Sequence, residues 1–201
     1  MDAADSTSQS SEQVQSFIPS QLWLIASLIL LVVSGAWIWL SKAPPGSTSN
    51  NGIPAPRQGF TAPDFSLQSA DGSIVTLSEL RGRPVLVNLW ASWCPPCRAE
   101  MPAMQEVFEE YQDAGFVILA VNTTYQDDPN DALAFVDELG LSFPILFDAD
   151  GSVSHRYQSR ALPTSFFVDQ EGIIQEVVVG GPMADALLRI RVEQLIEQKS
   201  L

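Results

Sequence analysis

Short hydrophobic runs recur along the chain from about residue 60 onward, and most of them have the length of β-strands. The runs Val85–Leu89 and Val117–Val121 are apolar at nearly every position, as expected of strands buried on both faces of a sheet. Ser165–Val168 and Ile173–Val179, joined by the sequence Asp-Gln-Glu-Gly, predict a β-hairpin. A further strand is predicted at Ile74–Thr76, on the outer side of the sheet.

Apolar residues with helical spacing predict three helices. The first begins near Pro95, the second covers Asn130–Leu139 after a long connection, and the third lies near the C-terminus. The residues expected to face the core are Met101, Met104, Val107, Phe108 and Tyr111, then Leu133, Phe135, Val136 and Leu139, and finally Leu187, Ile190, Leu195 and Ile196. With one more strand predicted at Pro144–Leu146, residues 60–201 are expected to form an α/β sandwich with a mixed sheet.

A longer hydrophobic run, Leu22–Leu40, contains 19 residues without a charge. At a helical rise of about 1.5 Å per residue it approaches the ~30 Å thickness of a hydrocarbon core. Tryptophans near both ends suit the membrane interface, so we predict a transmembrane anchor over 22–40. A buried core helix is one alternative. A signal peptide cleaved near Ser34–Ala36 is another, but no positive charge precedes the run, and apolar residues continue beyond Ala36.

The segments on either side of this run are polar. Residues 1–21 form a tail rich in Ser and Gln, and residues 41–59 form a linker of prolines and small polar residues. Neither has enough apolar surface to offset the entropy cost of folding. The nearest basic residues, Lys42 and Arg57, follow the run, so the positive-inside rule weakly favours a cytoplasmic domain.

Composition narrows the classes of function. The 201-residue chain carries ten Lys and Arg against 24 Asp and Glu, a formal charge of −14, which argues against binding nucleic acid through phosphate contacts. From residue 60 on there are 21 acidic and eight basic residues, so we expect a preference for neutral or basic partner surfaces. Two cysteines exclude a disulfide-rich framework and a four-cysteine zinc site, and the single His155 excludes a His-rich metal site. We expect no metal and no cofactor, and a surface position for His155.

Both cysteines lie in the motif Trp93-Cys94-Pro95-Pro96-Cys97, between a predicted strand and a predicted helix. The positive end of a helix favours thiolate over thiol, and this spacing brings the second sulfur within reach of the first. We infer that Cys94 attacks and Cys97 resolves, in a pair that cycles between dithiol and disulfide. The alternatives are a structural disulfide, which would close a loop too short to stabilise the fold much, and half of a zinc site, which lacks further ligands.

The two prolines between the cysteines have no backbone N–H group and also stiffen the turn. They remove two donors that would otherwise face the Cys94 thiolate. We therefore expect the thiol pKa of Cys94 to be lowered only moderately, as in reductants rather than strong oxidants.

Three further segments accompany the cysteine motif. They are Ala-Pro-Asp-Phe-Ser-Leu at 62–67, Leu-Ser-Glu-Leu-Arg-Gly at 77–82, and Leu-Pro-Thr at 162–164 with the Phe-Phe-Val-Asp that follows. With residues 87–102 they resemble the membrane-anchored TlpA/ResA-like thiol–disulfide oxidoreductases of the thioredoxin superfamily, over about 62–195. The resemblance implies a thioredoxin-like three-layer α/β sandwich with a mixed central sheet, preceded by one transmembrane helix. The long connection before Pro163 is consistent with an insertion found in this subgroup.

The resemblance also implies which residues bind the substrate. Pro163 is expected to form a cis peptide bond beside the disulfide, with a trans proline in a tight turn as the alternative. The backbone of Leu162 is expected to pair with an extended substrate segment. Trp93 and Trp90 are expected to shield the site, although Trp90 suits the core alone.

Two polar residues bear on proton transfer. Asn88 stands where thioredoxins carry a buried Asp, and an amide cannot exchange a proton in that way. Glu100, three residues after Cys97, matches an acidic residue near the active site of ResA-like proteins. We expect Glu100 to exchange a proton with Cys97. A solvated glutamate without a role is the alternative.

By resemblance, the protein reduces protein disulfides outside the cytoplasm, as in cytochrome c maturation, with electrons from an upstream membrane donor. The family topology is a single-pass cell-membrane protein with an extracytoplasmic catalytic domain. This topology opposes the cytoplasmic placement inferred from Lys42 and Arg57, and we favour the family topology. A peroxiredoxin-like peroxidase shares the Ala-Pro-Asp-Phe opening but needs Thr or Ser where Ala91 stands. A non-catalytic binding module with an inert disulfide is the other alternative.

Overall fold

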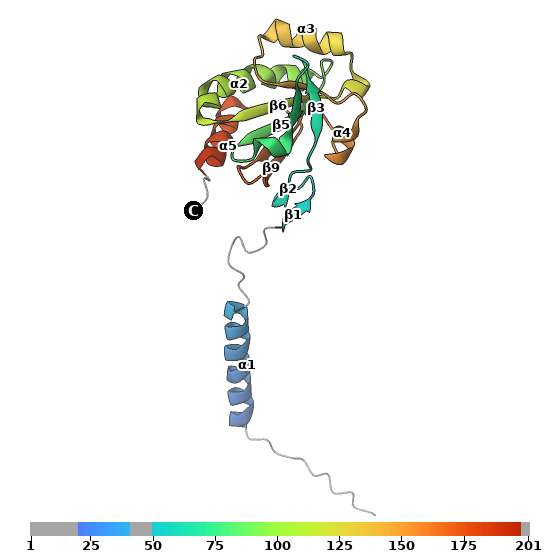
Figure 1. The fold of residues 1–201 in the computed structure, drawn as a ribbon. Helices are drawn as coiled ribbons and strands as arrows, with labels where there is room; N and C mark the ends of the chain where they lie inside the picture. Colours follow the sequence, from blue (N-terminus) through green and yellow to red (C-terminus); the bar gives the residue numbers. More distant parts are fainter. Residues whose placement is uncertain (1–19, 41–49, 198–201) are drawn as a thin grey trace, which may run out of the picture. The chain divides into compact units, whose positions relative to one another are not determined.

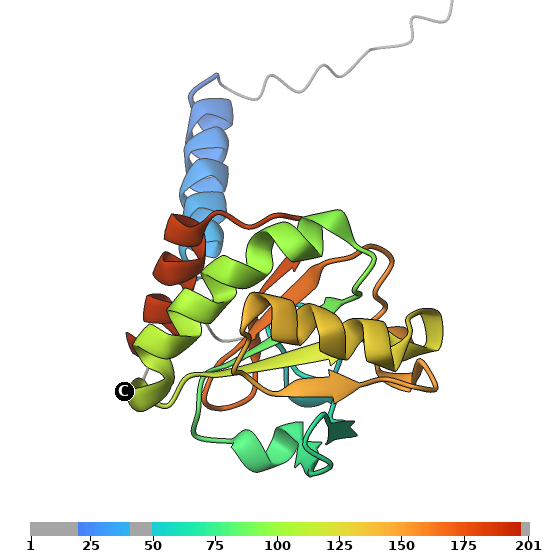
Figure 2. The same ribbon diagram turned by 90° about the horizontal axis from the view of Figure 1, so that it is seen from above.

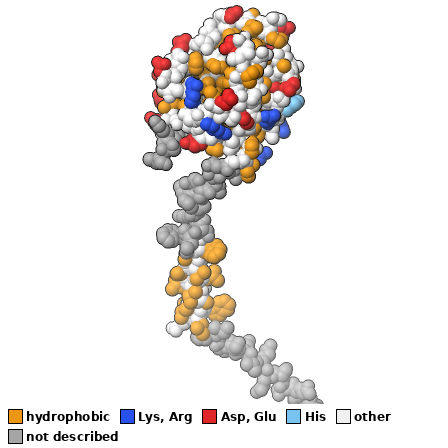
Figure 3. Space-filling view, in the orientation of Figure 1, with side chains coloured by type: hydrophobic (Ala, Val, Ile, Leu, Met, Phe, Trp, Pro, Cys, Tyr) orange, Lys and Arg blue, Asp and Glu red, His pale blue; other side chains and the backbone are white. Residues whose placement is uncertain are grey.

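The computed structural model describes residues 20–40 and 50–197, which belong to two separate compact units. The first unit contains one helix, α1 (Ser20–Leu40), and its large apolar side chains from Leu22 to Trp37 are exposed (Figure 3). Within these described ranges, no helix meets the length and apolarity needed to cross a membrane, so the predicted anchor over residues 22–40 is not confirmed. Most of the predicted tail (1–21) and about half of the predicted linker (41–59) lie outside the described residues.

The second unit is built on a central sheet with helices packed beside it (Figure 1). This sheet has seven strands in the order β4-β3-β7-β6-β5-β8-β9. These strands are β3 (Ser66–Ser69), β4 (Ile74–Thr76), β5 (Val85–Trp90), β6 (Val117–Asn122), β7 (Ile145–Phe147), β8 (Thr164–Val168) and β9 (Ile174–Val179). Strands β5, β6 and β7 are parallel, and antiparallel pairs extend them on both sides. A separate parallel pair joins β1 (Asn50–Pro54) and β2 (Phe60–Thr61).

Helices cover both faces of this sheet, which gives three layers (Figure 2). One face carries α2 (Pro95–Tyr111), α3 (Pro129–Leu139) and α5 (Asp185–Glu197), and the other carries α4 (Ser152–Arg156) and the 3₁₀ turn η1 (Leu77–Leu80). Because side chains alternate along a strand, β5 contributes Leu86 to the first face and Val87 to the second. The predicted α/β sandwich with a mixed central sheet is confirmed.

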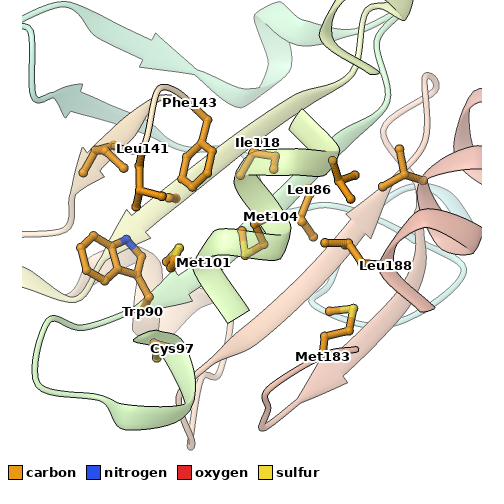
Figure 4. Packing of buried hydrophobic residues seen from close by; sticks show 14 of the residues in the cluster. Leu86, Trp90, Cys97, Met101, Met104, Ile118, Leu141, Phe143, Met183 and Leu188 are labelled. Carbon is orange, nitrogen blue, oxygen red and sulfur yellow. The ribbon is translucent and has the colours of Figure 1, made fainter. Parts of the chain in front are cut away.

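The face that carries α2 has a core of large apolar side chains (Figure 4). Met101 and Met104 of α2 and Leu188 of α5 are at most 1% exposed. Trp90 packs against Phe135 of α3 with ring centroids 4.9 Å apart. Burying one such side chain stabilises the folded state by roughly 1.5–3 kcal/mol, so this cluster fixes α2 against β5. Trp90 is fully buried in this core, as one of the two predictions for it expects.

Three residues predicted to face the core are instead exposed, namely Leu133, Leu187 and Ile190. In α5 the core-facing positions include Leu188 and Val192. The predicted positions (Leu187 and Ile190) and the observed ones (Leu188 and Val192) are each spaced three or four residues apart, so each pair lies on one side of a helix that turns about 100° per residue. Only contacts with the sheet decide between them, and the sequence pattern does not contain those contacts.

Two elements have almost no sequence signal. Strand β3 is mostly polar, with Leu67 as its one large apolar residue, and it lies near the edge of the sheet beside β4. Helix α4 is a single short segment of five residues, too short for a helical period to be recognised.

Candidate active site

The cysteine pair lies where β5 ends and α2 begins. A short loop, residues 91–93, follows β5, and Cys94 takes the N-cap position of α2. Cys94 and Cys97 form a disulfide bond with an S–S distance of 2.14 Å and Cα atoms 5.3 Å apart. Cys94 is 2% exposed and Cys97 is fully buried. The pair therefore lies at the carboxyl end of a parallel strand, where open α/β sheets commonly bind ligands.

The start of α2 offers one backbone donor to the Cys94 sulfur. The N–H of Cys97 donates to Cys94 Sγ at an N···S distance of 3.3 Å. Pro95 and Pro96 occupy the first helical positions and have no N–H to donate. A thiolate on Cys94 would thus be stabilised by the helix N-terminus and by a single backbone hydrogen bond.

A cavity of about 270 Å³ opens beside Cys94. Three segments line it, namely residues 93–96, part of residues 123–126 in and before η3 (Thr124–Gln126), and residues 159–162. Trp93 is 56% exposed, and its indole N–H donates to the carbonyl of Gln126 at 3.0 Å. This bond fixes the indole beside η3, where its exposed ring surface is available to a substrate.

Asp127 ties two of these segments together. Its carboxylate accepts hydrogen bonds from the N–H of Ser92 at 2.7 Å and from the Ser92 hydroxyl at 2.6 Å. The amide of Asn122 also donates to it, at 2.7 Å. The loop before Cys94 is thereby joined to the segment that carries η3. This role cannot be predicted from the sequence, because Asp127 precedes the N-cap residue Asp128 and resembles a second capping residue.

The third segment ends in a cis peptide bond between Leu162 and Pro163, as the resemblance implies. The Pro163 carbonyl accepts from the N–H of Gly180 at 2.8 Å, which joins this loop to the end of β9. Gly181 lies in tight contact with its surroundings: a Cβ there would lie 2.9 Å from Pro163 Cγ and 2.8 Å from Glu100 Oε2. The segment after β9 thus packs against both Pro163 and Glu100.

Glu100 is buried, with only 1% of its surface exposed. Its Oε1 accepts from Asn88 Nδ2 at 3.0 Å, and its Oε2 accepts from the N–H of Met183 at 3.2 Å. Burial raises the pKa of Glu100, and the two hydrogen bonds oppose that effect only in part. The alternative of a solvated glutamate is therefore wrong. The carboxyl is suited to hold a proton one helical turn from Cys97.

Asn88 connects three elements around this carboxyl. Its Nδ2 donates to Ser165 Oγ at 2.9 Å as well as to Glu100, so it joins β5 to β8 and α2. Its Oδ1 is buried without a hydrogen-bond partner among the described residues. Asn88 thus orients Glu100, whereas the buried Asp expected at this position of a thioredoxin would itself carry the proton.

The residues predicted from the sequence divide into two groups. Trp93, Cys94 and Leu162 line the cavity. Cys97, Glu100 and Pro163 do not line it, and Cys97 belongs to the hydrophobic core (Figure 4). In the part of the chain that the structure describes, no group of three His, Cys, Asp or Glu side chains is placed to hold a metal ion.

Comparisons with known proteins agree with this geometry. The model of the AhpC/TSA family matches residues 59–177. The thiol-disulfide oxidoreductase ResA of Oceanobacillus iheyensis is 41% identical over 135 residues, which cover 65% of this chain and 69% of ResA. The thioredoxin-like protein YneN of Bacillus subtilis is 38% identical over 159 residues, covering 79% of this chain and 89% of YneN. The crystal structure of a thiol:disulfide interchange protein DsbE from Chlorobium tepidum has a TM-score of 0.65 at 33% identity, covering 70% of this chain and 98% of the other.

Proposed function

Because the chain belongs to the AhpC/TSA family and, within the thioredoxin superfamily, to the thiol-disulfide oxidoreductases of the ResA and DsbE type, we propose that it reduces protein disulfides outside the cytoplasm. One observation carries the proposal: two cysteines with redox-active spacing lie at the start of α2, and the first of them borders a cavity. The roles of the two sulfurs follow from their access. Cys94 lines the cavity and is the attacking thiol, and the fully buried Cys97 is the resolving thiol.

The reaction consists of two thiol–disulfide exchanges. The Cys94 thiolate attacks one sulfur of the substrate disulfide, whose S–S bond breaks, and the other substrate sulfur leaves as a thiolate and takes up a proton. Cys97 then loses its proton and attacks Cys94 Sγ, which releases the second substrate sulfur to be protonated in turn. Two electrons pass to the substrate, and the enzyme ends with the Cys94–Cys97 disulfide seen in the structure. An upstream dithiol donor in the membrane reduces this disulfide for the next cycle.

Glu100 is the proposed proton acceptor of Cys97 in the second exchange. Its burial one turn from Cys97 and its raised pKa support this role, because a carboxyl that holds a proton more tightly than usual is a better base. Asn88 and Met183 orient it through their hydrogen bonds. The low number of donors around Cys94 supports work as a reductant, since a strongly stabilised thiolate is typical of oxidants.

The substrate is proposed to bind along the cavity as an extended segment. The backbone of Leu162 would pair with it, and the exposed indole of Trp93 would pack against its side chains. Pro163, which is buried and lies outside the cavity lining, would hold the backbone next to Leu162 in place. Residues 159–162 lie between α4 and β8, outside the sheet ladder. The backbone of Leu162 has no hydrogen bond to the other described residues, so it can pair with a short added strand.

The location is part of the same proposal. We place the catalytic unit on the extracytoplasmic side of the cell membrane, attached through α1, and extend the proposal to cytochrome c maturation. The absence of charged residues from α1 and its exposed apolar side chains support attachment, and the family resemblance supports the side. Protease added to intact cells or spheroplasts should cleave the catalytic unit. Cleavage only after the cell membrane is broken would contradict the proposed side.

Reduction of insulin disulfides tests the activity. The reduced wild-type protein should precipitate insulin B chain in the presence of dithiothreitol, and Cys94→Ser should not. Activity that persists in Cys94→Ser at the wild-type rate would overturn the proposal. Ser154→Ala is a matched control, since it removes a hydroxyl hydrogen bond on the other face of the sheet.

A peroxidase is the second candidate, because the matching family model is that of AhpC/TSA. A peroxidase of this kind needs a hydroxyl side chain three residues before its reactive cysteine, and Ala91 at that position before Cys94 has none. The reduced protein should consume hydrogen peroxide no faster than an equal concentration of free dithiol. Rapid peroxide consumption that depends on Cys94 would favour the peroxidase.

A further inference from the structure

Arg160 stands apart from the other arginines of the catalytic unit. Residues 60–197 contain seven arginines, and six of them have a side-chain hydrogen bond or ion pair. The six paired arginines are Arg81, Arg83, Arg98, Arg156, Arg189 and Arg191. The side chain of Arg160 is exposed and has no such partner within the described residues. Three of the six bind backbone carbonyls and three bind carboxylates, so Arg160 alone among the seven has a guanidinium without an internal partner in the described residues.

The position of Arg160 places its charge at the cavity beside Cys94. Arg160 lines the cavity that also borders Cys94, and it is the only charged residue in that lining. Its backbone lies two residues before Leu162, whose backbone is proposed to pair with the substrate. Within the lining of this cavity, a bound segment therefore meets one positive charge and no negative one.

The loop that carries Arg160 is held in place by its neighbours. Gln158 adopts a left-handed backbone conformation (φ 51°), which turns the chain sharply after α4. The N–H of Ser159 donates to the carbonyl of Ser154 at 3.0 Å, and the hydroxyl of Thr164 donates to the carbonyl of Ala161 at 2.7 Å. The backbone on both sides of Arg160 is thus fixed, while its guanidinium remains available to an incoming group.

The net charge of the domain limits which substrates can place a carboxylate at Arg160. With 21 acidic and eight basic residues from position 60 on, the domain as a whole repels acidic proteins. A guanidinium binds a carboxylate through paired, charge-assisted hydrogen bonds, and it does so best where water is partly excluded. The cavity therefore favours a local carboxylate on a substrate whose overall surface is neutral or basic.

We propose that Arg160 determines substrate specificity by binding an Asp or Glu side chain close in sequence to the reacting cysteine of the substrate. The inference rests on the proposed reductase function and names the substrate class for the same site. Because Arg160 and Cys94 line the same cavity, the carboxylate lies within a few residues of that cysteine along an extended chain.

The test uses a matched set of peptides in which a cysteine forms a mixed disulfide with a chromogenic thiol. Each peptide has Asp, Asn or Lys at one position within three residues of the cysteine. The reduced wild-type protein should show a kcat/KM about 5- to 10-fold higher for the best Asp peptide than for its Asn partner, the range of a partly exposed charge-assisted contact. The gain should lie in KM and should decline as salt is added.

Three variants separate specificity from other roles. Arg160→Gln should abolish the preference for Asp over Asn, and Arg160→Lys should keep part of it. Arg57→Gln is the matched control, because Arg57 is exposed, has no side-chain partner among the described residues and lies outside the cavity lining. That variant should behave like the wild type.

Two results would overturn the inference. An unchanged preference in Arg160→Gln would remove Arg160 from substrate selection. An equal loss of kcat/KM for all peptides, together with a raised thiol pKa of Cys94, would mean that Arg160 acts on the nucleophile instead. If the wild type reduced none of the peptides and not insulin either, the proposed function itself would fail, which is a different outcome.

Discussion

The two faces of the central sheet each bury a carboxylate, and the two carboxylates differ in their surroundings. On the face that carries α2, Glu100 accepts two hydrogen bonds, and burial raises its pKa. On the other face, Asp148 follows β7 and is fully buried. It accepts hydrogen bonds from the N–H groups of Val153 and Ser154 at 3.1 and 2.8 Å and from the Ser154 hydroxyl at 2.7 Å.

The comparison suggests different roles for the two residues: Glu100 lies near the cysteine pair, and Asp148 fixes α4 to the end of β7. Asp148 satisfies the free N–H groups at the start of α4, as an N-cap side chain does. Glu100 lies one helical turn after Cys97 on α2, and its donors are the Asn88 side chain and the N–H of Met183. Both faces nevertheless serve the cavity, because the Asp148 carbonyl accepts the N–H of Tyr125 at 3.2 Å and so anchors η3.

The largest expected effect on stability is on the scaffold side. Asp148→Ala leaves two buried N–H groups and a hydroxyl without an acceptor, so we expect the free energy of unfolding to fall by about 2–4 kcal/mol. Urea unfolding of the oxidised protein measures this loss. Asp148→Asn keeps one acceptor oxygen and should lose roughly half as much. Equal stability of Asp148→Ala and wild type would remove the distinction between the two carboxylates.

The next effect concerns the chemistry on the cysteine side. Glu100→Gln keeps the size of the side chain but cannot take up a proton, so we expect kcat for disulfide reduction to fall by about 10- to 100-fold. The pH dependence of kcat should also flatten. Glu106→Gln, which changes an exposed glutamate on the same helix, is the control. A wild-type pH profile in Glu100→Gln would mean that Glu100 only supports the fold.

A smaller effect links Glu100 to stability. Its raised pKa means that the folded protein binds this proton more tightly than the unfolded chain does. The stabilising contribution of the proton is therefore complete below the ordinary carboxyl range and is lost as pH rises through the raised pKa. As pH rises through this pKa, the free energy of unfolding of the wild type should fall relative to that of Glu100→Gln. Urea unfolding at a series of pH values measures this difference. A difference that does not change with pH would contradict the raised pKa.

The smallest expected effect concerns the exposed indole at the cavity. Trp93→Ala removes apolar surface that a substrate would cover, and we expect KM for protein substrates to rise about threefold with little change in kcat. Trp93→Phe keeps an aromatic ring but loses the hydrogen bond to Gln126, so its KM should lie between the two. An unchanged KM in Trp93→Ala would exclude the indole from substrate binding.

Features with a local sequence signal were predicted well. Strands β5, β6, β8 and β9 have apolar runs, and α2 begins at Pro95 as its proline pair and apolar stripe indicate. The cysteine pair and the cis bond before Pro163 depend on a few adjacent residues. Features that depend on packing were missed or wrong. The α5 stripe chosen from spacing faces solvent at Leu187 and Ile190, because only the sheet determines which side of that helix is buried.

The same distinction holds within the site. The spacing of Glu100 from Cys97 suggests a role, but its burial comes from β5 and from the segment after β9, both distant in sequence. The hydrogen bonds that Ser92 donates to the Asp127 carboxylate cross 35 residues. That Arg160 has no partner is seen only when the partners of the other arginines are known. No local pattern contains such relations.

Trapping the reaction intermediate tests the central claim, that Cys94 attacks the substrate and Cys97 resolves it. Reduced Cys97→Ser keeps the attacking thiol but cannot complete the second exchange, so it should accumulate a mixed disulfide with a disulfide-bonded substrate. Mass spectrometry of the digested complex should find the substrate on Cys94, and Cys94→Ser should form little adduct. A substrate bound mainly through Cys97 in Cys94→Ser, with no adduct in Cys97→Ser, would contradict the account.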